Sequence, residues 1–155
     1  MRAFSFLLIN YIVITYQLIQ YISIEVTILQ TGYIRARVYT SDAQIPIENA
    51  IFTVYTDNGG STVLLGTRIT DNEGNTSVIP VEAPDSSLTL TPGSLNPFTT
   101  VNIRIDHPEY KTLFVTGVQV FGGQVSIQET SLIPIDRNVP TDSRAQLYDV
   151  SKQNL

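Results

Sequence analysis

The stretch Thr70-Asp71-Asn72-Glu73-Gly74 decides how the surrounding chain folds. It is a short polar turn between two runs rich in β-branched residues, 63–70 and 76–81. The carboxylate of Asp71 is suited to accept hydrogen bonds from backbone N–H groups, which is how Asp commonly holds such turns. The sequence therefore predicts two antiparallel strands joined here, with Asp71 and Gly74 as the structural residues of the turn.

Strand patterns continue on both sides of this turn. Apolar and polar residues alternate along 33–40 and again along 99–106, which is the period of a strand with one buried face. Seven strands are expected in total, at 33–40, 50–56, 63–70, 76–81, 99–106, 110–121 and 124–133. Since no helical period lies between them, residues 30–135 are predicted to form a seven-stranded antiparallel β-sandwich in an all-β chain.

The alternation also predicts which side chains form the core. In the earlier strands and in 99–106, the residues expected to be buried are Ile34, Ala36, Val38, Phe52, Val54, Val101, Ile103 and Ile105. In the last two strands they are Phe114, Val118, Val120, Val125 and Ile127. Residues 83–97 hold several prolines and interrupt the pattern, so a long surface loop is predicted there.

Composition restricts the partners and the chemistry that are open to this chain. Of its 155 residues, 9 are Lys or Arg and 14 are Asp or Glu, which gives a net charge of −5. This balance argues against nucleic acid as a partner, because binding to phosphates requires clustered basic residues. The absence of Cys excludes disulfides, thiolate zinc sites and cysteine nucleophiles.

Both ends of the chain differ from the predicted sandwich. Residues 1–29 are apolar, and 3–24 carry no charge, which is long enough for one helix across a bilayer. Three interpretations stay open for this segment: a membrane anchor, a signal peptide, or a stretch upstream of a mis-assigned start. Residues 136–155 are polar and are predicted to be a flexible tail, with at most a short helical turn near 145–150.

Two segments of the predicted sandwich resemble the carboxypeptidase regulatory-like domain. The first is Ile45-Pro46-Ile47-Glu48-Asn49-Ala50-Ile51-Phe52-Thr53-Val54, and the second is the turn 70–74. Domains of this family are seven-stranded prealbumin-like (transthyretin-like) sandwiches. The resemblance therefore implies this fold for residues 30–135.

A narrower resemblance is to the N-terminal non-catalytic region of clostridial spore cortex-lytic proteins. It covers about two-thirds of the chain as an ordered set of segments: GYIRARVYT (32–40), AQIPI (43–47), PFTTVN (97–102), HPEY (107–110), VQVFGGQ (118–124) and LIPI (132–135). In that family the region precedes a catalytic or peptidoglycan-binding part. The resemblance thus implies an accessory module or a stand-alone relative, without lytic activity in this chain.

Residues with catalytic or metal-binding chemistry do not form a recognised pattern. His107 is the single histidine, its neighbour Asp106 points to the opposite side of a strand, and no G-x-S-x-G nucleophile turn exists. Asp71, Glu73 and Asn75 alternate as calcium ligands do, but Gly74 is followed by no acidic residue at the distance that the EF-hand pattern requires. We therefore predict no enzyme activity, no cofactor and no metal.

The outward-facing side chains of strand 33–40 are the best candidates for an interface. They are Tyr33, Arg35, Arg37 and Tyr39, and Arg104 is expected to share their surface. Aromatic and arginine side chains are enriched among the residues that dominate protein interfaces. The alternative is an ordinary solvated sheet surface covered by arginine stems.

These predictions favour a non-catalytic accessory or regulatory β-sandwich module associated with a spore or cell-envelope peptidoglycan-lytic system. Its expected partner is a protein or a peptidoglycan-lytic domain, with peptidoglycan or another glycan as a further candidate. The alternative is a surface module that binds glycan or protein and is tethered to a membrane through residues 3–24. An enzyme is the third hypothesis, and the residue inventory argues against it.

Overall fold

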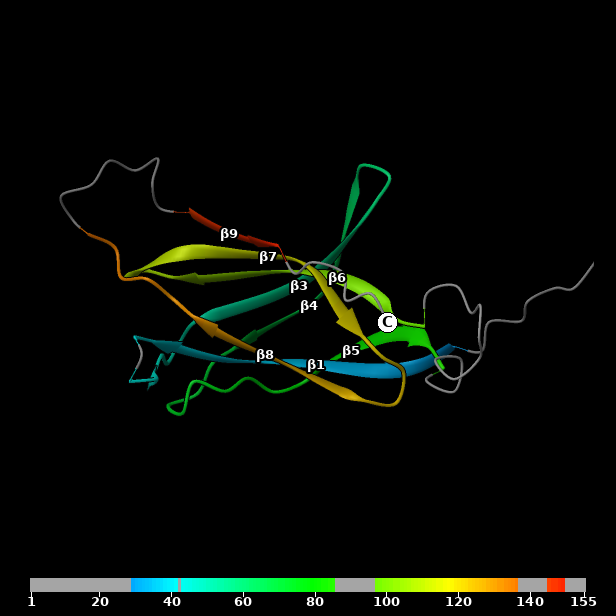
Figure 1. The fold of residues 1–155 in the computed structure, drawn as a ribbon, viewed down its shortest axis with the longest axis horizontal. Helices are drawn as coiled ribbons and strands as arrows, with labels where there is room; N and C mark the ends of the chain where they lie inside the picture. Colours follow the sequence, from blue (N-terminus) through cyan, green and yellow to red (C-terminus); the bar gives the residue numbers. More distant parts are fainter. Residues whose placement is uncertain (1–28, 42, 86–96, 137–144, 150–155) are drawn as a thin grey trace, which may run out of the picture.

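The computed structural model describes residues 29–41, 43–85, 97–136 and 145–149. Nine strands and no helix are found in these residues. The strands are β1 (Leu29–Thr40), β2 (Ile45–Pro46), β3 (Ile51–Asn58), β4 (Ser61–Ile69), β5 (Ile79–Pro84), β6 (Thr99–His107), β7 (Tyr110–Val120), β8 (Val125–Ser131) and β9 (Ala145–Asp149). They form two facing sheets, which confirms the predicted all-β sandwich (Figure 1).

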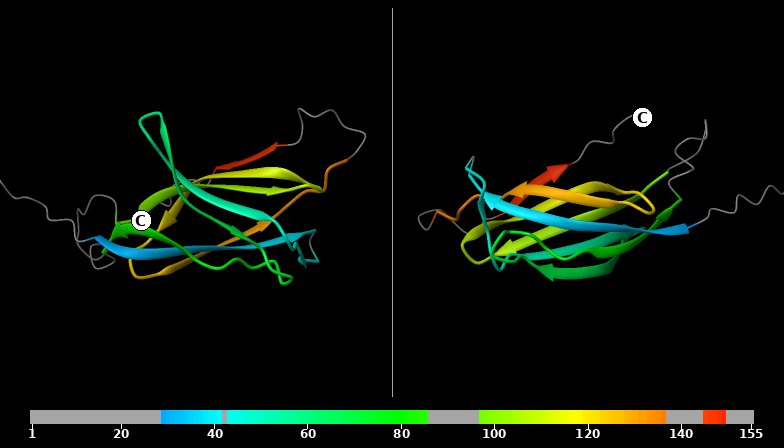
Figure 2. Two further views of the ribbon diagram at one scale, coloured as in Figure 1. Left: turned by 180° about the vertical axis from the view of Figure 1, so that it is seen from behind. Right: turned by 90° about the horizontal axis from the view of Figure 1, so that it is seen from below.

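The first sheet, called sheet A, is built around β1. Strands β5 and β2 pair with β1 in antiparallel orientation along one side, and β8 pairs with it in parallel along the other. The second sheet, sheet B, has the order β4-β3-β6-β7-β9, in which β7 and β9 are parallel (Figure 2). The two sheets are therefore mixed, and the prediction of purely antiparallel pairing is wrong for β8, while β9 lies outside the predicted sandwich.

The core lies between the sheets and consists of their inward-facing apolar side chains. Strand β1 contributes Ile34, Ala36 and Val38, all of them fully buried, as the alternation predicts. Sheet B contributes the other buried residues that were predicted from its first strands, namely Phe52, Val54, Val101, Ile103 and Ile105. Each fully buried Val, Ile or Phe stabilises the fold by about 1.5–3 kcal/mol relative to exposure, so this layer is the main source of stability.

The pairing of β6 with β7 contains a bulge that corrects one core prediction. The register shifts between Val101 and Ile103, and Gly117 on the opposite strand adopts a φ of 78° there. One extra residue in a strand reverses which side chains face inward. Val118 is therefore buried as expected, whereas Phe114 lies outside the core and the prediction that it is buried is wrong.

The face of β8 is also the reverse of the prediction. Val125 and Ile127 are 53% and 50% exposed, while Thr130 and the adjoining Leu132 are buried. The cause is the parallel register with β1, in which Ile127 lies beside the outward-facing Arg35. Paired residues of neighbouring strands point to the same side of a sheet, so Ile127 must also point outward.

Three further segments differ from the strands that the sequence predicts. Strand β5 covers Ile79–Pro84, so it begins later and ends later than the predicted 76–81. Strand β9, Ala145–Asp149, replaces the tail or helical turn expected at these positions. The two-residue strand β2 lies between the predicted strands 33–40 and 50–56, and it pairs with the end of β1.

Several predictions fall on residues that the structure does not describe. They concern the apolar segment 1–28, the loop residues 86–96, and residues 137–144 and 150–155 of the predicted tail. In the described part of the chain, no helix has the length and apolar character needed to span a membrane.

Candidate functional site

A groove runs along the outer face of sheet A and follows β1. It has a volume of about 570 Å³. Its floor is formed by the outward-facing Arg35, Arg37 and Tyr39 of β1, because alternate residues of a strand share one face. Strand β8 borders one side, and the segment that contains β2 and the turn after β4 borders the other. The residues that line these two sides are Ile127 and Glu129, then Gln44, Pro46, Asn72, Glu73 and Asn75.

The turn after β4 holds one side of this groove in place through its own hydrogen bonds. Asp71 Oδ1 accepts bonds from the backbone N–H groups of Glu73 and Asn75, both at 2.9 Å. The Gly74 N–H donates to the backbone carbonyl of Asp71 at 3.0 Å. The carboxylate therefore holds the backbone of the turn, as the sequence predicts. The side chains of Asn72, Glu73 and Asn75 take no part in these bonds.

Two buried threonines fasten the turn to the rest of the sandwich. Thr70 Oγ1 accepts a bond from Ala50 N–H at 2.8 Å and donates to the Ile47 carbonyl at 2.7 Å. Thr76 Oγ1 accepts a bond from Ala36 N–H at 2.9 Å. These hydroxyls satisfy backbone groups that would otherwise be buried without partners, so they fix the position of the turn against β1.

Gly74 is required at its position for two reasons. Its φ of 76° lies in the left-handed region that L side chains rarely adopt. A Cβ atom there would lie 2.3 Å from the Val38 carbonyl oxygen, and this carbonyl belongs to the backbone of β1. The Gly74 carbonyl in turn accepts a bond from Val38 N–H at 2.8 Å. A side chain at 74 would push the turn away from the floor of the groove.

One arginine of the groove forms an ion pair, and the other does not. Arg37 Nη1 lies 3.6 Å from Glu129 Oε1, and both side chains are about half exposed. Arg35 has no ion pair and no side-chain hydrogen bond among the described residues. The groove therefore presents one guanidinium group that the fold itself does not use.

The structure separates the five residues that were predicted to form an interface. Arg35, Arg37 and Tyr39 line the groove, and Tyr33 lies on the same outer face, beside Val125 and Pro80. Arg104 does not share this surface, because it points outward from sheet B on the opposite side of the sandwich.

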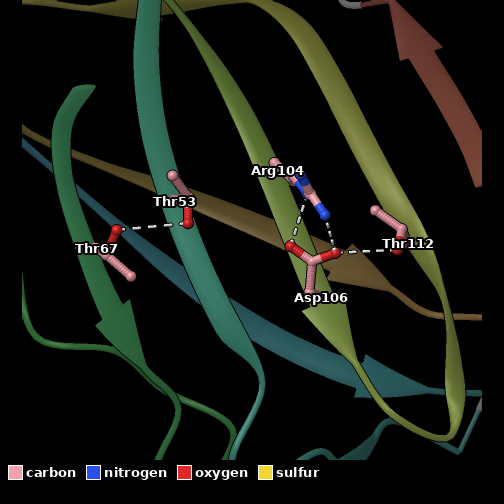
Figure 3. Close-up of polar contacts among 5 residues, drawn as sticks. All are labelled: Thr53, Thr67, Arg104, Asp106 and Thr112. Carbon is pink, nitrogen blue, oxygen red and sulfur yellow. Dashed lines mark hydrogen bonds and ion pairs between the residues drawn. The ribbon is translucent and has the colours of Figure 1, made fainter. Parts of the chain in front are cut away.

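The surroundings of Arg104 explain its position without a ligand. Its Nη2 donates to Asp106 Oδ1 at 2.9 Å, and Thr112 Oγ1 donates to the same oxygen (Figure 3). The hydrogen bond and the charge of Asp106 raise the pKa of Arg104 above its ordinary value. The guanidinium carbon also lies 5.6 Å from the centre of the Phe114 ring, so the group is engaged by its neighbours on sheet B.

The residues weighed for catalysis and metal binding have structural contacts. His107 Nδ1 accepts a bond from Glu109 N–H at 3.2 Å, and its ring packs edge-on against Tyr110, so it stabilises the β6–β7 turn. In the part of the chain that the structure describes, no group of three His, Asp or Glu side chains could hold a metal ion. Asp106 is occupied by Arg104 and Thr112 rather than by His107.

The residues that border the groove were not predicted from the sequence. Ile127 and Glu129 come from a strand whose face was assigned the wrong way, Asn72 was seen only as part of a turn, and Glu73 was weighed only as a calcium ligand. The sequence of the turn contained a weak indication of a binding surface. Asp71 alone holds the turn, so the polar side chains of Asn72, Glu73 and Asn75 are not needed for its structure.

Comparison with known proteins adds little to these observations. No family model matches the chain, and no curated protein matches it significantly. Similar solved structures include 3-chlorocatechol 1,2-dioxygenase from Rhodococcus opacus 1CP, at 11% identity and a TM-score of 0.44 over 72% of this chain and 62% of that one. Chlorocatechol 1,2-dioxygenase from Pseudomonas putida has 12% identity and a TM-score of 0.37 over 78% and 59%.

A third similar structure is the type II cohesin–X-dockerin complex from Acetivibrio cellulolyticus, with 22% identity and a TM-score of 0.32 over 64% of this chain and 51% of that one. The chain thus spans less than two thirds of each of these proteins. At such TM-scores the likeness supports no conclusion about function.

Proposed function

We propose that this protein is a non-catalytic accessory or regulatory module of a spore or cell-envelope peptidoglycan-lytic system. We assign residues 30–135 to a carboxypeptidase regulatory-like domain of the prealbumin type, in which β8 pairs in parallel with β1, and β9 lies outside this range. The segments 32–40, 43–47 and 97–102, which resemble the non-catalytic region of clostridial spore cortex-lytic proteins, support this assignment.

The observation that carries the proposal is the groove on sheet A. It gathers Arg35, Arg37 and Tyr39 on a rigid sheet, and the guanidinium of Arg35 has no partner among the described residues. A concave surface with unused polar groups fits a binding role. His107, by contrast, does not line this groove, and its ring nitrogen accepts a bond from the backbone of Glu109.

A pull-down tests the proposal directly. The full chain is immobilised and exposed to spore coat and cortex extract, and captured proteins are identified by mass spectrometry and assayed for cortex release. We expect the wild type to recover a peptidoglycan hydrolase, and Arg35→Ala/Arg37→Ala to recover at least about tenfold less, since interface arginines are common hot spots. Arg104→Ala is the matched control, because this arginine is exposed on the opposite sheet, and it should recover as much as the wild type.

Two results would contradict the proposal. Equal recovery by the double variant and the wild type would remove the groove from the docking surface. Release of cortex fragments by the purified chain alone would show that the module is itself catalytic.

A further inference from the structure

The groove holds polar side chains that the fold leaves unused. The side-chain amides of Gln44, Asn72 and Asn75 make no hydrogen bond among the described residues, and neither does the guanidinium of Arg35. Amide groups both donate and accept, so three of them around one groove suit a ligand covered with hydroxyl or acetamido groups. These four residues come from three separate segments of the chain. A ligand that contacts all of them must therefore bind across the groove and not to a single turn.

The charges of the groove select against strongly charged ligands. Its four charged side chains are two arginines and two glutamates, namely Arg35, Arg37, Glu73 and Glu129. Arg37 and Glu129 lie 3.6 Å apart and largely compensate each other. A polyanion would meet Glu73 and Glu129, and a basic peptide would meet both arginines. The one guanidinium left over, on Arg35, suits a single carboxylate, which it can bind through two parallel hydrogen bonds.

The apolar surfaces and the size of the groove also fit a sugar. Tyr39, Pro46 and Ile127 line it together with the polar groups, and the faces of pyranose rings are apolar. From Arg35 to Tyr39 the floor extends about 13 Å, at roughly 3.3 Å per residue, which is enough for a short oligosaccharide. The volume of about 570 Å³ lies within the range of roughly 300–1,000 Å³ that small-molecule sites occupy.

We propose that this groove binds an acidic glycan, a chain of pyranose sugars with isolated carboxylates between neutral hydroxyl and acetamido groups. Arg35 binds the carboxylate, the three amides bind the neutral groups, and Tyr39 lies against a sugar ring. This inference rests on the proposed function and deepens it, because it concerns the same groove and names a glycan as a ligand of that groove in addition to the protein partner.

The test is a titration of the full chain with two matched disaccharides. The acidic probe is N-acetylglucosaminyl-N-acetylmuramic acid, and the neutral probe is di-N-acetylchitobiose. Binding is measured by calorimetry, and the site is mapped by heteronuclear NMR. We expect the acidic disaccharide to bind at least about tenfold more tightly, because hydrogen bonds to charged groups contribute more than neutral ones. Shifts of the amide signals should concentrate at residues 35–39, 72–75 and 127–129.

Variants assign the carboxylate to its partner. Arg35→Gln should bind both disaccharides with the affinity that the wild type shows for the neutral one, so the tenfold preference disappears. Arg104→Gln should keep the preference. The melting temperature of each variant shows whether it is folded, and Arg35→Lys, which keeps the charge without the two parallel bonds, should retain part of the preference.

Equal affinity for both disaccharides, no binding of either, or an unchanged preference in a folded Arg35→Gln would overturn the assignment. Binding of a glutamate-containing peptide in place of the sugars would also overturn it and would indicate a protein ligand. The two proposals fail separately. If the sugars do not bind but a hydrolase is still captured through the groove, only the glycan is wrong, and if the sugars bind but no hydrolase is captured, only the lytic association is wrong.

Discussion

Replacement of Gly74 by Ala should strongly destabilise the fold. The left-handed conformation at 74 costs an L-residue about 1–2 kcal/mol. The new Cβ would lie 2.3 Å from the Val38 carbonyl oxygen, so the turn must move, and the bond from Val38 N–H to the Gly74 carbonyl is lost. That bond contributes about 1 kcal/mol. We expect the free energy of unfolding to fall by about 3 kcal/mol, measured by urea denaturation.

Gly59→Ala is the matched control for this change. Gly59 also has a positive φ, of 58°, but a Cβ there would meet no atom within 4 Å. This variant should lose only the conformational part, about 1–2 kcal/mol. In thermal unfolding, about 4 °C per kcal/mol predicts a melting temperature about 12 °C lower for Gly74→Ala and about 4–8 °C lower for Gly59→Ala. Equal losses in the two variants would refute the argument, because the contact with β1 would then have no effect.

Three further changes test other parts of the structure by urea denaturation. Thr70→Val should lower the free energy of unfolding by about 2–4 kcal/mol, since it leaves two buried backbone groups without partners, whereas Thr70→Ser should lower it by about 1; similar losses would show that the hydroxyl is unimportant. Leu132→Ala should lower the free energy of unfolding by about 2–5 kcal/mol, and Ile127→Ala should lower it by less than about 1 kcal/mol. The reverse order would mean that Ile127 faces the core, as the sequence predicted. Asp71→Ala should lower it by about 1–2 kcal/mol and Asp71→Asn by less, because Asn keeps an acceptor oxygen; a larger loss in Asn would contradict the role of Oδ1.

Strands with a clear local alternation were predictable from the sequence. In β1 and β6 every second residue is apolar, and Ile34, Val38 and Ile103 are buried as this pattern requires. In β7 the same rule fails at Gly117, because a bulge there changes which residues face inward. The spacing of the apolar residues does not reveal this bulge. A prediction from strict alternation cannot locate the extra residue that a bulge inserts into a strand.

The errors in β8 and β9 have a different physical origin. The outward face of β8 is set by its parallel pairing with β1, in which Val125 lies beside Tyr33. This contact joins distant parts of the chain, so the local sequence, with Val125 and Ile127 as its apolar residues, points to the wrong side. Strand β9 leaves its large apolar side chains Leu147 and Tyr148 exposed, and it is held by backbone pairing with β7.

The candidate site was predictable only in its floor. Alternation along β1 placed Arg35, Arg37 and Tyr39 together, which the groove confirms as neighbours on one face. Its sides required knowledge of which turn and which strand flank β1, and this depends on the register of sheet A. Arg104 was assigned to the same surface because an outward position in a strand does not reveal which sheet the strand joins.

The central place of β1 in sheet A has a consequence for how the protein is made. Tyr33 lies between the strand of Pro80 on one side and the strand of Val125 on the other, both far along the chain. During translation, at roughly 5–20 residues per second, the earliest strand must wait several seconds for its last neighbour. Over that interval the edge of β1 that β8 later covers carries unpaired backbone groups, which makes this edge a site where another chain can pair.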